Sequence, residues 1–197
     1  TNFTAPAGFL TIRNGTFRLS STGALALTPF NATTTILYTA RIWMNSATST
    51  MSFTGGNINL YGDMMVSSGT VSVGSAANNG ISSNGGLLTV SGGTLNVAGR
   101  YDRPNTTCLS RFTMTGGTFN LNTVGSTSTT LAPFQMDVLG SQYTHTGGTI
   151  VIRREGGTGA QNLGFNCTGA NINNALGGTL QIGDALTPVA QIMLINT

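Results

Sequence analysis

Few residues of this chain could do chemistry, and one short cluster of them stands out. Asp102 is flanked by Arg100 and Arg103, with Tyr101 beside it. A carboxylate between two guanidinium groups can hold a polar ligand or form ion pairs at a surface. We take Arg100, Tyr101, Asp102 and Arg103 as a candidate surface cluster. An exposed loop between two strands is the favoured interpretation of the segment.

Catalysis on polysaccharides needs more than this cluster supplies. Glycoside hydrolases use two carboxylates, and lyases use an acidic calcium site with a basic residue. No two carboxylates of this chain lie close in sequence, although stacking of repeats could bring distant ones together. The carboxylates are Asp63, Asp102, Asp137, Glu155 and Asp184. We predict no catalytic residue and no enzyme activity, with a carbohydrate-active lyase or hydrolase as the alternative.

The remaining reactive side chains indicate no metal or cofactor site. Cys108 and Cys167 form no CxxC motif and have no adjacent histidine. A disulfide between neighbouring coils and two separate buried thiols are both open, and the thiols are favoured. His145 takes a position expected to face the interior. No GxSxG, HExxH or P-loop motif is present.

Aromatic and threonine side chains leave two binding alternatives. Trp43, Tyr38, Tyr61, Tyr101 and Tyr143 could form a platform for stacking sugars, although Trp43 with its neighbours is better explained as the core of an irregular coil. A column of threonines on a solenoid face could bind ice. The second threonine column that such a lattice needs is missing from the sequence.

Charge and hydropathy exclude further partners. All eight cations are arginines, spread along the chain, and the net charge is +3. Nucleic-acid binding needs a denser stripe of cations and stacking aromatics, so we predict no nucleic-acid partner. No hydrophobic stretch reaches the length of a membrane span. The opening TNFTAPAG suggests a mature product or an internal segment.

The elements that must position these residues come from a repeated phrase. Seven times a glycine is followed by a polar residue and then by two apolar residues separated by one other, as in GGTLNV and GGTFNL, and the separating residue is polar in every phrase except GGTIVI. This is the alternation of a strand with one buried face. Glycine suits a turn because it accepts positive φ and carries no side chain. The predicted turn glycines are Gly15, Gly56, Gly69, Gly93, Gly117, Gly148 and Gly178.

Repetition at a nearly fixed period predicts a solenoid. One strand pair is marginal alone, so the copies must stack in parallel and share a core. Gly69, Gly93 and Gly117 are equally spaced, and their interval fits one coil of three short strands, whereas the interval from Gly56 to Gly69 is too short for one. We predict an all-β, right-handed parallel β-helix of roughly six to eight coils. Residues 1–197 form a single segment of a longer array, with 29–50 as an irregular coil or insertion.

Composition agrees with this fold. The chain has no lysine, one glutamate and 28 glycines, and charged residues make up 7%. Residues that favour helices on exposed faces are therefore scarce, and we expect essentially no helix. The hydrophobic share of 39% is too high and too regular for a disordered tract.

Three phrases resemble the β-helical regions of very large surface proteins of Bacteroidota. They are FTMTGGTFNL, YTHTGGTIVI and LGGTLQIGDALTPVAQIMLINT, and the resemblance covers most of residues 50 to 197 and more loosely 8 to 28. It implies export by type IX secretion and a kinship with the mobile adhesins of gliding motility. The secretion signal and C-terminal sorting domain of that family are missing here, which favours an internal piece.

We therefore expect a stalk or filament segment of an extracellular, cell-surface adhesin, linked to gliding or surface attachment. Its partners would be further repeats of the same chain, or copies stacked end to end, and a surface polysaccharide. Adhesion would be weak at each contact and multiplied along the repeat.

Overall fold

The computed structural model describes residues 2–4, 12–156, 163–174, 177–188 and 193–197. These residues form strands, turns and bends, and none of them is helical. Accordingly, no helix in the described part of the chain is long and apolar enough to cross a membrane. The prediction of an all-β chain is confirmed.

The strands form two sheets in which every pairing is parallel. The eleven-stranded sheet contains β1 (Asn2–Thr4), β2 (Gly15–Leu19), β3 (Ala26–Phe30), β5 (Ala40–Phe53), β7 (Asp63–Val73), β9 (Leu87–Val90), β10 (Thr94–Val97), β12 (Arg111–Leu121), β14 (Ser141–Ile152), β16 (Ala170–Asn174) and β17 (Thr179–Ile182). The seven-stranded sheet contains β4 (Thr34–Ile36), β6 (Ile58–Leu60), β8 (Ile81–Ser83), β11 (Tyr101–Asp102), β13 (Phe134–Gln135), β15 (Leu163–Asn166) and β18 (Leu194–Asn196).

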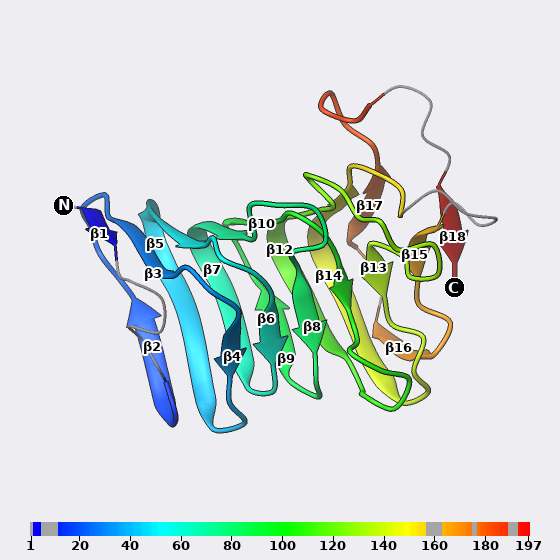
Figure 1. Cartoon of the computed structure of the whole chain (residues 1–197), viewed down its shortest axis with the longest axis horizontal. Helices are drawn as coiled ribbons and strands as arrows, with labels where there is room; N and C mark the ends of the chain where they lie inside the picture. Colours follow the sequence, from blue (N-terminus) through cyan, green and yellow to red (C-terminus); the bar gives the residue numbers. More distant parts are fainter. Residues whose placement is uncertain (1, 5–11, 157–162, 175–176, 189–192) are drawn as a thin grey trace.

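The chain alternates between the two sheets and so winds into a parallel β-solenoid. Each turn of the winding adds one short strand to the seven-stranded sheet, so the described residues make seven coils, as predicted. Figure 1 shows the coils stacked along the long axis, with β1 and β18 at opposite ends of the stack. Chain order therefore equals spatial order along the axis.

Apolar residues on consecutive coils lie in register and form columns inside the solenoid. Phe112, for example, pairs with Leu88 on one side and with Tyr143 on the other, and all three are buried. A second column runs through Val71, Leu95, Phe119, Ile150 and Leu180. The core is thus shared between neighbouring coils, as the alternation in the sequence predicts.

Five of the seven predicted turn glycines lie at one place in consecutive coils, between the two halves of the long strands. Each precedes a threonine of one aligned column, Thr70, Thr94, Thr118, Thr149 and Thr179. Gly69, Gly93, Gly117 and Gly148 have φ between +67° and +82°, which a glycine accepts without strain. In the last motif Gly177, not Gly178, has a positive φ, of +105°.

At such a glycine, the alternation of inward-facing and outward-facing side chains shifts by one residue. In β7, Met64 and Val66 point inward before Gly69, and Val71 and Val73 point inward after it. A Cβ at Gly117 would lie 2.6 Å from the carbonyl oxygen of Gly93 and 2.7 Å from the carbonyl carbon of Gly92. Glycine is therefore needed here for both its φ and its small size.

The other two glycines occupy different places. Gly15 begins β2 and pairs with Ala40, and Gly56 lies in the turn between β5 and β6. The short interval between Gly56 and Gly69 therefore separates two different turns of one coil, and it does not correspond to a short coil.

Residues 29–50, which we predicted to be an irregular coil or insertion, contain both paired strands and register shifts. They include β4 and most of β5, which pair with β6 and β7 respectively. The register of β5 against β7 shifts between Met44 and Asn45 and again between Asn45 and Thr50, and the register of β3 against β5 shifts between Leu27 and Phe30. The Ser46 Oγ donates to the Ser21 carbonyl at 2.8 Å and lies 2.7 Å from the Ser49 Oγ, so two buried serines are hydrogen-bonded in the stretch opposite Gly69.

Candidate functional site

The strand alternation divides the predicted cluster between two sides of the sheet. Tyr101 and Asp102 form β11, so their side chains point in opposite directions. The Tyr101 ring is completely buried, its hydroxyl donates to the Arg111 carbonyl at 3.2 Å, and burial raises its pKa. Tyr101 is therefore a core residue, and only Arg100, Asp102 and Arg103 remain as candidate ligand-binding groups.

Asp102 belongs to a polar column on the outer face of the seven-stranded sheet. Register pairing aligns one polar side chain from each coil along this face. The column consists of Thr35, Asn59, Ser82, Asp102, Gln135, Asn166 and Asn196. Asp102 is the one charged residue of this column. The other members are neutral polar residues that can form hydrogen bonds.

Arg100 connects three consecutive coils beside this column. Its Nε donates to Asp102 Oδ2 at 2.9 Å, and its Nη1 donates to Asn78 Oδ1 at 3.2 Å and to Ser126 Oγ at 2.5 Å. Asn78, at φ +68°, also holds Thr127 through its amide group. The guanidinium is thus fixed by side chains from loops that are distant in sequence.

Arg103 makes a bidentate ion pair with Asp137 of the next coil. Its Nε donates to Asp137 Oδ1, and its Nη2 donates to Asp137 Oδ2 at 2.5 Å. The two side chains are 11% and 22% exposed, so the pair is partly shielded from solvent. Two parallel hydrogen bonds fix the orientation of both groups.

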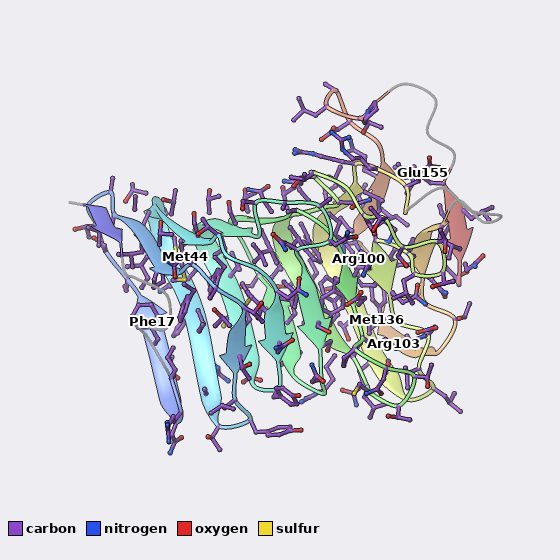
Figure 2. The ribbon with its side chains drawn as sticks, in the orientation of Figure 1. Phe17, Met44, Arg100, Arg103, Met136 and Glu155 are labelled. Carbon is purple, nitrogen blue, oxygen red and sulfur yellow. The ribbon has the colours of Figure 1, made fainter. Side chains whose placement is uncertain are left out.

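A polar depression of about 240 Å³ lies between these groups. Its walls combine Arg100, Asp102 and Arg103 with Asn57, Asn78, Ser82, Pro104 and Leu131. Within the described part of the chain, Arg100 Nη2, Arg103 Nη1 and Asp102 Oδ1 have no hydrogen-bond partner. We call this feature the arginine pocket, and Figure 2 shows Arg100 and Arg103 in the C-terminal half of the stack.

The two aspartates of this region have opposite pKa shifts. Burial raises the pKa of Asp102, and the hydrogen bond from Arg100 opposes that shift only in part. The hydrogen bonds from Arg103 lower the pKa of Asp137. Two carboxyl groups whose pKa values shift in opposite directions therefore lie on neighbouring coils, each next to its own arginine.

The remaining carboxylates include two that form further ion pairs among the described residues. Asp63 pairs with Arg41 and Asp184 with Arg153, each at 2.7 Å. The described part contains no group of three or more histidine, cysteine or acidic side chains that could hold a metal ion. Cys108 and Cys167 are both free, and Cys167 is buried, which raises its pKa.

His145 faces the interior, as predicted. It follows Met114 in an inner column and is 4% exposed. Its Nδ1 lies 3.0 Å from the Tyr143 hydroxyl and its Nε2 lies 3.3 Å from the Gly148 carbonyl oxygen. Desolvation lowers the pKa of the imidazole. These contacts are those of a hydrogen-bonded core histidine.

The aromatic residues named above separate into three environments. Tyr101 and Tyr143 are buried in the core, where aromatic rings from several coils cluster. Trp43 lies half-buried on the outer face, with Arg18 over its ring at 4.1 Å and its Nε1 donating to Ser67 Oγ at 2.6 Å. Tyr38 is exposed and contacts Tyr61.

Several members of the arginine pocket could not be identified from the sequence cluster alone. The register partner of Asp102 is Ser82, at a shorter interval than that between Gly69 and Gly93, so the glycine period does not place Asn78 beside the cluster. Asp137 and Ser126 belong to a longer coil with no such interval. Their approach to Arg103 and Arg100 depends on loop conformation that the repeat does not encode.

No protein-family model matches the chain, and comparisons with curated proteins and with solved structures also find no match. The resemblance to Bacteroidota surface proteins therefore stays a prediction.

Proposed function

We propose that this chain is a structural and adhesive segment of a large extracellular protein, in which stacked coils form a stalk or filament at the cell surface. The observation that carries the proposal is that inward-facing side chains of the C-terminal coil are exposed to solvent. Ile152 is 0% exposed, but Ile182, the next residue in its column, is 40% exposed. Phe165 is 3% exposed, but Ile195, its partner on β18, is 49% exposed.

These uncovered columns end at sheet edges that a further coil could extend. β17 and β18 each have one pairing partner among the described residues, and so each leaves one edge unpaired. Unpaired edges with apolar neighbours are templates for added strands. The partner would be a further repeat of the same chain or the N-terminal coil of another copy. The linear stack in Figure 1, with β1 and β18 at opposite ends, supports growth along the axis.

The adhesive part of the proposal rests on the polar column and the arginine pocket. Their free guanidinium, amide and carboxylate groups are suited to the hydroxyls of a surface polysaccharide. A stack of such segments would multiply weak contacts. Export by type IX secretion and a role in gliding or surface attachment follow from the resemblance, and they belong to the same proposal.

Two measurements test this function. Light scattering and negative-stain imaging of the purified chain should show rods that lengthen with concentration, and Ile182→Asp combined with Ile195→Asp should keep the chain as single short rods. A monodisperse wild-type chain at high concentration would contradict end-to-end assembly. A glycan array combined with a degradation assay should show binding without turnover.

A carbohydrate-active enzyme is the second candidate, favoured by one observation. Asp102 and Asp137, each hydrogen-bonded to an arginine, lie on neighbouring coils, and glycoside hydrolysis uses two carboxyl groups. If the degradation assay detects turnover, Asp102→Asn should abolish it, and the adhesive proposal would be wrong. Retention of turnover in Asp102→Asn would place the activity elsewhere.

A further inference from the structure

A pair of tyrosines, the exposed Tyr38 and the half-buried Tyr61, lies at one corner of the solenoid, away from the arginine pocket. Tyr38 is in the turn between β4 and β5, and Tyr61 is in the turn between β6 and β7, so the two occupy the same corner of consecutive coils. Their ring centroids are 5.1 Å apart at an interplanar angle of 64°. Tyr38 is 74% exposed, so it is accessible to solvent although its ring contacts the ring of Tyr61.

A depression of about 290 Å³ adjoins the Tyr38 ring. Its polar lining comes from Thr16, Thr39, Arg41 and Asp63, on three consecutive coils. Gly15 also lines it, and a Cβ at that position would meet no atom within 4 Å. A methyl group at this position would therefore project into open space.

Arg41 and Asp63 form a fixed pair of donor and acceptor groups in this lining. They are cross-strand partners in register on β5 and β7. The Arg41 Nε and Nη2 both donate to Asp63 Oδ2, at 3.2 and 2.7 Å. In the described part of the chain, Arg41 Nη1 and Asp63 Oδ1 have no hydrogen-bond partner. One donor and one acceptor therefore stay available next to an aromatic ring.

This combination is suited to a sugar ring. A pyranose has an apolar face of C–H groups that can stack on a tyrosine, and hydroxyls at its edge that need both donors and acceptors. The charge of Arg41 is balanced by Asp63, so the site has no excess cation for a polyanion or a nucleic acid. A purely apolar ligand would leave the ion pair unused and desolvated.

We propose that Tyr38, Arg41 and Asp63 bind a pyranose unit of a neutral polysaccharide. The proposal deepens the adhesive function by naming the ligand class, and it adds a second contact point that is separate from the arginine pocket. Two such sites on one rod would allow one polysaccharide chain to be held at two places.

The test uses the full chain and four defined probes, namely cellohexaose, xylohexaose, mannohexaose and a hexamer of polygalacturonate. Isothermal titration and saturation-transfer NMR should detect binding of at least one neutral hexamer in preference to the galacturonate. Tyr38→Ala should weaken that binding at least tenfold, and Asp63→Asn about fivefold. Tyr38→Phe should keep at least a third of the affinity, because the ring remains.

The control is Leu139→Ala, since Leu139 is 87% exposed and lies in a different coil. Because Tyr38 is at the surface, its variants should keep the wild-type melting curve. The proposal is overturned if no probe binds, or if Tyr38→Ala binds as tightly as the wild type. If binding is lost in Asp102→Asn but kept in Tyr38→Ala, the adhesive function stands and this second site is wrong.

Discussion

The central coils and the C-terminal coil contain the same kinds of inward-facing residue but differ in how well those residues are covered. In β10, β12 and β14 the inward side chains Leu95, Phe119 and Ile150 are completely buried. The corresponding residue of β17, Leu180, is only partly buried. Its chemistry and register are unchanged, but among the described residues β17 pairs with β14 only, so Leu180 has a paired strand on one side.

In this fold, the burial of an inward-facing side chain therefore depends on the neighbouring coils. A single coil has no interior of its own, because each inward side chain needs a coil above and a coil below it. The stability of such a stack is approximately a sum of contributions from each coil and from each interface between coils. The same substitution should therefore cost more in the centre than at the end.

The largest contrast should come from deleting a core side chain in each region. Phe119→Ala removes a buried ring that contacts Tyr101, Phe112 and Phe134, and it should lower the unfolding free energy by about 3–5 kcal/mol. Ile182→Ala should cost less than about 1 kcal/mol, because that side chain is already partly in water. Urea denaturation followed by circular dichroism measures both. Equal losses would show that the end coil is as well packed as the centre.

A smaller contrast should come from alanine at two glycines with similar φ. Gly117→Ala brings both left-handed strain and collision with the backbone of the previous coil, so we expect a loss of more than about 2 kcal/mol. Gly15→Ala, at φ +86° with no atom near the new Cβ, should lose only about 1 kcal/mol. Thermal melts of the two variants, compared with the wild type, separate the steric cost from the conformational cost. A similar loss for both would mean that coil spacing tolerates the extra methyl group.

The central coils are also where the sequence predicts the structure best. The equal spacing of Gly69, Gly93 and Gly117 reproduces the register of the threonines that follow them directly. At residues 29–50, which we predicted to be an irregular coil or insertion, paired strands alternate with register shifts. Ser46 and Ser49 form side-chain hydrogen bonds there, and no repeat signal in the sequence marks them.

The candidate site shows the same division between periodic and irregular parts. Alternation in β11 is enough to separate the buried Tyr101 from the outward Asp102, so that part could have been predicted. The ion pair between Arg103 and Asp137 joins groups that lie far apart in sequence, in loops of unequal length. The repeat period does not predict which residues of such loops meet in neighbouring coils. The two groups come together only in the folded chain.

Acid should weaken the region around His145 more than the centre of the stack. Desolvation lowers the pKa of His145 in the folded state, so the unfolded chain takes up the proton more readily. The stability contribution is complete above the unfolded pKa of about 6.5 and falls as the pH decreases below it. His145→Met copies Met114, the neighbouring residue of the same column. Between pH 7.5 and pH 5, the melting temperature of the wild type should therefore fall more than that of this variant. Parallel curves would mean that His145 is protonated equally easily in both states.

The smallest contrast should come from two ion pairs. Asp137 accepts two hydrogen bonds from Arg103 within the central coils, whereas Asp184 accepts one from Arg153 near the C-terminal coil, at 2.7 Å. Asp137→Asn should cost about 1 kcal/mol at pH 7, and Asp184→Asn about 0.5 kcal/mol or less. The pKa of Asp137 is lowered by Arg103, so its contribution is complete above the unfolded value of about 3.9 and is lost as the pH falls through the folded pKa. Urea midpoints of both variants and the wild type at pH 7 and pH 3 measure this, and the penalty for Asp137→Asn should shrink at the lower pH. An equally large loss of stability in Asp184→Asn and Asp137→Asn would mean that ion pairs stabilise the end coil as much as the central coils, which would contradict the weaker stabilisation that we expect at the end.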